Sequence, residues 1–289
     1  MEKILILESR KKYHKMLADK KVLTISADGI ASNADSGNIP SVEISKIIAK
    51  KLNAEVGLKL KGQTAGNLFE QLTMQFLEET FPKMQHLRPG DWKILNLGNQ
   101  NKIKTSDFSQ NEHLAYLSEI ISENKKLETF LGNDYLILPD IVIYRNLCSD
   151  DEINFENIFV NDEICKKSDL RKVCGGKPIL HASISAKWTM RSDRAQNSRT
   201  EALNLIRNRK GHLPHIAVVT GENLPSRLAS LALGTGDLDC VYHFALYELI
   251  DSVKEFGKNG REDIIETLEN LIEGKRLKDI SDLVLDLCV

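Results

Sequence analysis

The sequence predicts an α/β fold in which a central β-sheet is flanked by helices. Segments that are apolar on both faces, as strands inside a sheet are, alternate with longer segments whose apolar residues recur at helical spacing. The chain has 289 residues, and 42% of them are hydrophobic, which is sufficient for one substantial core. No internal repeat or low-complexity linker interrupts the chain, so we expect a single domain over residues 1–289.

Helices, a strand and one long loop are expected in the first half of the chain, after a charged opening that is predicted to be helical. The stretch 26–41 is polar and rich in Gly and Asn, and loops of this length are usually functional or disordered. Apolar periodicity predicts helices over 41–52 and 65–81, a strand over 92–98, and an amphipathic helix over 111–132 that ends at Gly132.

The second half contains the segments that we expect to form the centre of the sheet. Strands over 134–146 and 178–188 are apolar on both faces and are separated by a polar excursion over 150–177. The later elements are predicted to be a helix over 193–211 capped by Gly211, a strand over 215–220, a helix over 224–233, and a strand running into a helix over 240–250. The last segment, 275–289, either packs on a neighbouring molecule or closes the core.

Composition and charge exclude several classes of protein. Lys and Arg number 39 against 41 Asp and Glu, a net charge of -2, so a protein that coats nucleic acid by bulk charge is excluded and any nucleic-acid site must be local. The 5 cysteines are odd in number and lack a C-x-x-C pair, which suggests neither a disulfide framework nor a zinc ribbon and fits a reducing cytoplasm. Neither a signal peptide nor a membrane span is indicated, so we expect a soluble cytoplasmic protein without membrane contact.

A carboxylate and a lysine stand out within the two apolar strands. Asp140 falls in the middle of the strand expected over 134–146, and burying an ionised carboxylate is costly unless a cation or strong donors compensate it. In the strand over 178–188, alternation places His181, Ser183, Ser185 and Lys187 on one face. The alternatives are a strand end where Asp140 reaches solvent and a lysine that is simply solvated.

The helix expected directly after the lysine adds a second acid. If Asp193 is its N-cap, Gln196 three residues later completes a start that resembles a capping box. Arg194, Asn197 and Glu201 then form one stripe at spacings of three and four residues. This stripe lies beside the end of the strand that carries the lysine.

Together these residues predict a site for a hard cation. Asp140, Glu201, Lys187 and the backbone carbonyl of Ala186 make an oxygen-rich site suited to Mg²⁺. Such a site hydrolyses phosphodiesters by polarising the phosphate, generating hydroxide near neutral pH and supporting the leaving oxygen. The lysine neutralises the phosphate or helps to activate water.

These motifs resemble the PD-(D/E)XK nuclease core. Pro139 and Asp140 match "PD", and Ser185 to Lys187 match the second motif, except that Ser185 stands where an acid is expected. In the CCGG-cutting branch of type II restriction endonucleases that acid lies on the next helix, where Glu201 stands. The runs "SAKWTMRSDRAQNSRTE", "GQTAGNLFE", "RPGDW" and "LALGTGDLDCVYHFALYEL" extend the resemblance over nearly the whole chain.

The resemblance implies a restriction-endonuclease-like fold with a central mixed sheet, and it implies roles for the site residues. Asp140 and Glu201 would bind metal, with Ser185 and Lys187 completing the catalytic face. A helix glutamate, matched by Glu70, would support them. Without the resemblance, Glu70 is equally well interpreted as a solvated surface residue.

The start of the helix after the lysine carries groups that can read base pairs. Arginine matches the O6 and N7 acceptors of guanine, and a carboxylate matches the N4 donor of cytosine. Arg191, Asp193 and Arg194 supply this set for CC paired with GG, at a helix start whose dipole suits phosphates. A solvated charge cluster is the alternative, but Arg191 follows the candidate catalytic lysine by only four residues, which favours base reading.

The resemblance extends this set of readers. Gln63 would make a minor-groove contact, and Arg227 would read an outer G:C pair, giving the site GCCGGC, cut after the first G to leave 5′ CCGG overhangs. Asp35 and Ser36 resemble loop contacts to DNA. A relaxed outer pair, as in relatives that accept RCCGGY, stays open.

The leading hypothesis is therefore a Mg²⁺-dependent, sequence-specific endonuclease that acts on palindromic double-stranded DNA. A twofold assembly would match the symmetry of the DNA, and the resemblance implies a homotetramer of two back-to-back dimers. It also implies a cognate methyltransferase in the host, with no direct contact. The competing hypothesis is a DNA-binding or structure-specific repair protein on the same core. A P-loop NTPase is rejected, because "GLKLKGQT" has Gln63 where the phosphate-binding lysine is required.

Overall fold

The structure is a computed structural model, and it describes residues 4–97, 104–123, 139–190, 192–234, 236–258 and 260–289. For residues 192–195 it describes the backbone but not the side chains.

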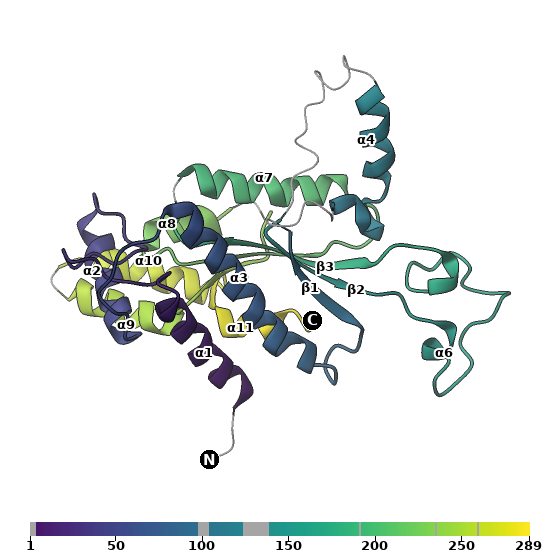
Figure 1. Cartoon of the computed structure of the whole chain (residues 1–289), viewed down its shortest axis with the longest axis horizontal. Coiled ribbons are helices and arrows are strands. Elements are labelled where there is room, and N and C mark those ends of the chain that lie inside the picture. Colours follow the sequence, from purple (N-terminus) through teal and green to yellow (C-terminus); the bar gives the residue numbers. More distant parts are fainter. Residues whose placement is uncertain (1–3, 98–103, 124–138, 191, 235, 259) are drawn as a thin grey trace.

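A mixed six-stranded sheet forms the centre of the described chain, with its strands in sequence order (Figure 1). The first three strands pair antiparallel, and the remaining pairs, from β3 to β6, are parallel. The prediction of an α/β fold with a central mixed sheet is thereby confirmed. The strands are β1 (Trp92–Asn96), β2 (Ile141–Arg145), β3 (Ile179–Lys187), β4 (His215–Thr220), β5 (Cys240–His243) and β6 (Leu277–Asp279).

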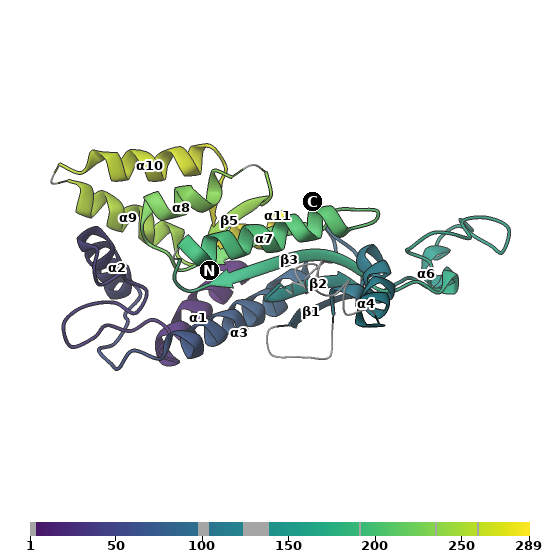
Figure 2. The same ribbon diagram turned by 90° about the horizontal axis from the view of Figure 1, so that it is seen from above.

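Helices cover both faces of this sheet. In Figures 1 and 2, α3 lies on one side of β3 and α7 on the other. α3 packs on α1 on the first of these sides. Farther along the molecule, α2 packs on α9, and α8 packs on α10. The α-helices are α1 (Leu5–Asp19), α2 (Ile39–Lys51), α3 (Gly62–Thr80), α4 (His113–Glu123), α6 (Asp150–Ile153), α7 (Ser192–Asn208), α8 (Pro225–Ala232), α9 (Leu246–Gly257), α10 (Glu262–Glu273) and α11 (Ile280–Asp286).

The core explains why these segments adopt these elements. β3 is buried along almost its whole length, as expected for a strand between two neighbours. α3 buries one apolar stripe, and the ring of Phe69 from that stripe lies 5.1 Å from the ring of Trp188, just after β3. This contact fixes the start of α3 close to the end of β3.

Some element boundaries differ from the predictions. β2 begins at Ile141, so Asp140 directly precedes the strand instead of lying in its middle, whereas 134–138 and Gly132 fall outside the described residues. α7 begins at Ser192, so Asp193 lies in its first turn and not at the N-cap. The same helix ends at Asn208, before the predicted cap Gly211, which adopts a φ of 71°.

A β-bulge in β3 changes the alternation of side chains that the sequence predicts for this strand. The pairing with β2 passes from Ala182 to Leu180 and omits His181. The His181 ring instead lies 4.6 Å from that of Trp92 and 5.7 Å from that of Phe81, on the side of the sheet that α3 covers. The prediction that His181 shares a face with Ser185 is therefore wrong, because an inserted residue reverses the alternation beyond it.

The C-terminal segment closes the core. β6 pairs with β5 at one edge of the sheet, and α11 follows it directly. Leu277, Ile280 and Leu283 are buried in the main hydrophobic cluster. Of the two predicted roles for this segment, core closure is confirmed. Among the described helices, none combines the length and the apolar character that crossing a membrane requires.

Candidate active site

The predicted catalytic side chains converge where the start of β2 meets the end of β3. Because these strands are antiparallel, Asp140, just before β2, lies next to Lys187, the last residue of β3. Glu201 comes from α7, and Glu70 comes from α3 on the opposite face of the sheet. The site therefore lies between the two helices that sandwich β3.

Asp140 and Ser185 organise the centre of the site. The Lys187 ammonium and the Ala186 backbone N–H each donate to Asp140 Oδ2, over 2.7 Å. The Ser185 hydroxyl lies 3.2 Å from Glu201 Oε2 and 3.4 Å from Asp140 Oδ2. Ser185 thus stands between the two carboxylates, and the structure brings all these predicted residues together.

The electrostatics of the site are set by burial and by the close approach of the carboxylates to Lys187. Burial raises the pKa of Glu70 to about 7, aided by the charge of Asp140 and opposed by Lys187 and Asn96. Burial also raises the pKa of Glu201. Burial alone would lower the pKa of Lys187, but the carboxylates of Asp140 and Glu201 outweigh it and keep the pKa above its ordinary value.

This donor set fits a divalent cation. Asp140 and Glu201 present hard oxygen atoms, and, besides burial, the charge of Asp140 contributes to the raised pKa of Glu201 and Glu70, a contribution that a bound cation would offset. In the part of the chain that the structure describes, no group of three or more His, Cys, Asp and Glu residues is placed to hold a metal. Mg²⁺ commonly takes only one or two protein carboxylates and completes its shell with water and substrate phosphate, so two carboxylates suffice.

Two neighbouring hollows open at this end of the sheet. One, of about 210 Å³, is lined by Glu70, Lys187 and Glu201 together with the exposed Gln63 at the start of α3. The other, of about 280 Å³, contains Asp35, Ser36, Met190, Glu222 and Arg227. Gly62 and Trp188 line both hollows. The catalytic groups and several predicted DNA-reading groups therefore occupy adjoining surfaces.

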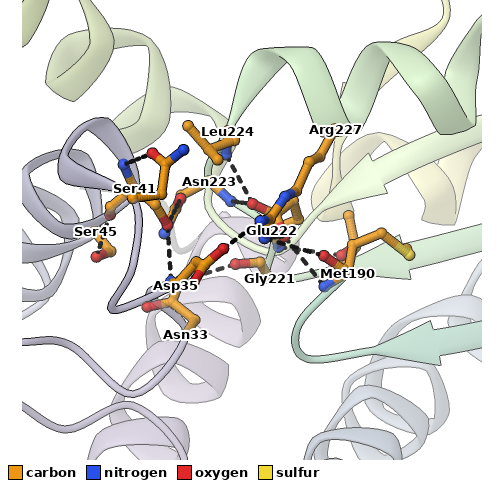
Figure 3. Close-up of polar contacts among 12 residues, drawn as sticks. Asn33, Asp35, Ser41, Ser45, Met190, Gly221, Glu222, Asn223, Leu224 and Arg227 are labelled. Atoms are coloured by element: carbon orange, nitrogen blue, oxygen red, sulfur yellow. Dashed lines mark hydrogen bonds and ion pairs between the residues drawn. The ribbon is translucent and has the colours of Figure 1, made fainter. Parts of the chain in front are cut away.

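The structure places some of the predicted DNA-reading residues together, and the side chains of others lie outside the described part of the chain. Arg227 on α8 forms an ion pair with Asp35 (Figure 3). The exposed Ser36 lines the same hollow. Arg191 lies outside the described residues. Asp193 and Arg194 belong to α7, but their side chains lie outside the description. Their role in base reading stays a prediction.

Several residues near the site were missed by the sequence analysis. The Ser198 hydroxyl of α7 lies 3.3 Å from that of Ser185, and the buried Asn96 ends β1 near Glu70. Glu222, just after β4, is only 1% exposed. Asn96 and Glu222 follow the same pattern as Asp140 and Lys187, a polar residue at or near the end of an apolar strand, and this signal could have identified them.

Comparisons with known proteins agree on one family. A family model described as NgoMIV restriction enzyme matches residues 13–289. The type II restriction enzyme NgoMIV of Neisseria gonorrhoeae is 49% identical over 286 residues, which cover 99% of this chain and 99% of that protein.

Solved structures of two restriction endonucleases match more distantly. A complex of PspGI with substrate DNA is 15% identical, covering 98% of this chain and 92% of that one, with a TM-score of 0.25. The type IIF enzyme Bse634I with cognate DNA is 16% identical, covering 90% and 92%, with a TM-score of 0.31. Scores this low give no basis for transferring geometry between the chains.

Proposed function

The chain belongs to the NgoMIV family and is a type II restriction endonuclease, and from this premise we propose that it cleaves double-stranded DNA at GCCGGC. Cleavage after the first G would leave 5′ CCGG overhangs. The observation that carries the proposal is the convergence of Asp140, Ser185, Lys187 and Glu201 within hydrogen-bonding distance, in a chain 49% identical to NgoMIV. A DNA-binding or structure-specific repair protein on the same core is not favoured by this family membership.

Each residue of the site has a proposed task. Asp140 and Glu201 would hold Mg²⁺, with the Ala186 carbonyl as a further ligand, and Ser185 would keep the two carboxylates together. When bound, Mg²⁺ supplies Lewis-acid stabilisation of the charge that develops on the phosphate. The Lys187 ammonium, held in place by Asp140, would neutralise and orient the scissile phosphate.

Glu70 has a supporting task in the proposed mechanism. Its pKa of about 7 allows the carboxyl to hold or release a proton near neutral pH. It lies close enough to Asp140 and Lys187 for their charges to shift that pKa. We therefore propose that Glu70 takes up or releases a proton when the charge at Lys187 changes during the reaction.

Recognition is proposed to use residues from several segments, grouped by the bases that they would read. Arg191, Asp193 and Arg194 would read the inner CC and GG bases, and Arg227 would read the outer guanine, with Asp35 and Ser36 at the same pair and Gln63 in the minor groove. The ion pair of Arg227 with Asp35 supports a joint role for these two residues. The alternative is a relaxed outer pair, RCCGGY.

The proposed assembly is a homotetramer built from two dimers. A twofold dimer matches a palindromic site. Residues 150–177, which make up most of the connection between β2 and β3 and which we call the arm, project from the sheet in both views (Figures 1 and 2). Exposed apolar side chains concentrated on one segment favour a protein contact, and those of the arm, each more than half exposed, are Phe155, Ile158, Phe159, Ile164 and Val173.

We place the enzyme in the cytoplasm, where its DNA substrate is. All its cysteines are free thiols, which suits a reducing compartment. A cognate methyltransferase in the same host would protect GCCGGC sites by acting on DNA, without contact to this chain.

Sequencing the ends of fragments from a plasmid of known sequence tests the proposal. With Mg²⁺, discrete fragments that begin with 5′ CCGG and follow a G are expected, and addition of EDTA should stop cleavage. Ends that follow either purine would establish RCCGGY instead. Retention of DNA without any cutting would contradict the catalytic assignment.

A further inference from the structure

Glu222 is a buried carboxylate that none of the proposed tasks uses. It lies in the connection between β4 and α8, residues 221–224, which we call the connector, and it is 1% exposed. Burial raises the pKa of this carboxyl, and backbone N–H groups and Arg227 oppose the rise. A carboxylate in such a place requires compensating donors, and their identity indicates what Glu222 does.

The two oxygen atoms of Glu222 face different parts of the molecule (Figure 3). Oε1 accepts the N–H groups of Asn223, over 3.1 Å, and Leu224, over 3.0 Å, within the connector itself. Oε2 accepts the N–H of Met190 over 3.1 Å and lies 3.7 Å from Arg227 Nη1. Only Oε2 therefore joins segments that are distant in sequence.

The two partners of Oε2, Met190 and Arg227, lie next to or belong to the residues that are proposed to read the bases. Met190 directly precedes Arg191, where the proposed inner set begins, and Arg227 is the proposed outer reader. Arg227 Nη1 also donates to the Met190 carbonyl over 3.4 Å, so these three residues form a closed network. A shift of any one of them changes the distance between the two reading segments.

The opposite side of the connector holds the loop that carries Asp35. Asn33 donates to the Gly221 carbonyl over 2.8 Å. Ser41 Oγ donates to Asn223 Oδ1 over 2.9 Å and accepts the Asp35 N–H over 2.9 Å. The connector is thus fixed between the loop and the segment after β3.

The connector is also tied to the catalytic strand. The Lys187 carbonyl accepts the Gly221 N–H over 3.1 Å and the Thr220 hydroxyl over 2.9 Å. The connector therefore contacts the backbone of the catalytic lysine as well as Met190 and Arg227.

We propose that Glu222 is a positioning residue for base recognition, whose Oε2 holds the start of the inner reading segment and the Arg227 guanidinium in a fixed relation. This inference rests on the proposed function, because it takes Arg227 as the reader of the outer base pair. A carboxylate that merely stabilised the connector would need only Oε1.

Glu222→Gln tests whether Oε1 and Oε2 have these different roles. The amide oxygen can still accept from Asn223 and Leu224, but an NH₂ group in place of Oε2 neither accepts the Met190 N–H nor attracts Arg227. The measurement is the ratio of kcat/KM for a duplex with GCCGGC to that for ACCGGT, which differs only at the outer pair. We expect this ratio to fall by about tenfold, the order of one base contact.

The ratio separates positioning from a purely structural role. A loss of folded enzyme lowers both rates by the same factor and leaves the ratio unchanged, and that result would overturn the proposal. Glu269→Gln makes the same chemical change at an exposed residue of α10, 3.6 Å from Lys254, and should leave both rates and the ratio unaltered. If Glu222→Gln does not fold, Glu222→Asp, which keeps the charge but shortens the reach, should lower the ratio in the same way.

A double-mutant cycle with Arg227→Ala gives a second test. If Glu222 acts through Arg227, the combined variant should lose little more discrimination at the outer pair than Arg227→Ala alone. Independent, multiplicative losses would contradict the inference. If the wild-type chain cuts another sequence, the proposed site is wrong, and the ratio is then measured against the outer pair of the sequence that is cut. An unchanged ratio in Glu222→Gln still overturns the role of Glu222.

Discussion

At the scale of single residues, Lys187 shows how the site holds a reactive group ready. Its ammonium is paired with Asp140 over 2.7 Å in a half-buried position, so its rotamers are restricted before DNA binds. A scissile phosphate can share this ammonium, because a lysine offers three N–H donors. The preorganised charge is the main contribution that the chain itself makes to the proposed reaction.

Replacing this lysine should separate cleavage from recognition. Lys187→Ala removes the cation at the phosphate, so we expect single-turnover cleavage to fall by at least about a hundredfold. Sequence-specific binding, measured by gel shift, should remain. In contrast, Arg194→Ala should weaken binding to the cognate site by about 1 to 3 kcal/mol. If both variants changed only the thermal stability, the assigned roles would be wrong.

Glu70 makes stability depend on pH in a defined direction. The folded chain keeps the proton up to a pKa of about 7, whereas the ordinary value is 4.5. Because the folded state binds more protons than the unfolded state between these values, stability falls as pH rises from about 4.5 to 7. The loss of stability is complete above the pKa of the folded state and absent below the pKa of the unfolded state.

Glu70→Gln should remove this loss. Relative to the wild type, the variant should gain about 1 kcal/mol between pH 4 and pH 8 in EDTA, a figure reduced for solvent screening because Glu70 is only partly buried. Urea unfolding at both pH values measures the difference. Glu269→Gln, on the exposed surface of α10, serves as the control. A gain of equal size at both pH values would contradict the assigned pKa.

At the scale of elements, the connector depends on the absence of a side chain at Gly221. A Cβ at this position would lie 2.5 Å from the Trp188 ring and 2.7 Å from the Trp188 carbonyl oxygen. The ring cannot withdraw easily, because Phe69 and Phe244 pack against it with centroids 5.1 and 5.2 Å away. The close approach of the connector to β3 therefore requires glycine.

Gly221→Ala should destabilise the fold by about 1 to 3 kcal/mol, the usual cost of overpacking. The midpoint of urea unfolding measures this change. Gly66→Ala in α3 is a matched control, because an added Cβ there meets no atom within 4 Å. Alanine is the better helix former, so this control should gain up to about 1 kcal/mol. Equal effects at the two positions would argue against the packing explanation.

The elements also show what could be predicted from the sequence. Local periodicity was sufficient for β3, β4, α3 and α8, because each buries a regular pattern of apolar residues. The bulge at His181 was not predictable in this way, since it depends on how β3 pairs with β2. A strand partner lies far away in sequence, and a one-residue shift leaves the composition of the strand unchanged.

The same limit applies to the site. Asp140 and Lys187 could be predicted, because charged residues at the ends of apolar segments stand out locally, and Glu201 because its helical spacing places it beside the end of that strand. Glu222 ends an apolar segment too, but its role depends on Met190 and Arg227, which folding brings together from different elements. Such a role becomes visible only when the contacts of each carboxylate oxygen are known.

At the scale of the whole molecule, the arm presents a surface that the fold of one chain does not need. Polar contacts hold it in place: Arg171 donates to Asp150 over 2.6 Å within the arm, and Lys177 donates to the Ser106 carbonyl over 2.7 Å at its base, while Ile158 and Phe159 remain exposed. Exposed apolar side chains on a projecting segment are suited to contact with a second copy. This arrangement supports the proposed pairing of dimers through the arm.

Charged residues in place of Ile158 and Phe159 should therefore break the proposed tetramer without unfolding the chain. Ile158→Glu combined with Phe159→Glu should halve the mass measured by sedimentation equilibrium, because each dimer loses the apolar contact. Leu87→Glu, an exposed leucine outside the arm, is the control and should leave the mass unchanged. If the tetramer couples two DNA sites, the double variant should also cut one-site and two-site plasmids at equal rates, whereas the wild type should prefer two sites. A variant that stays tetrameric would place the contact between dimers elsewhere on the molecule.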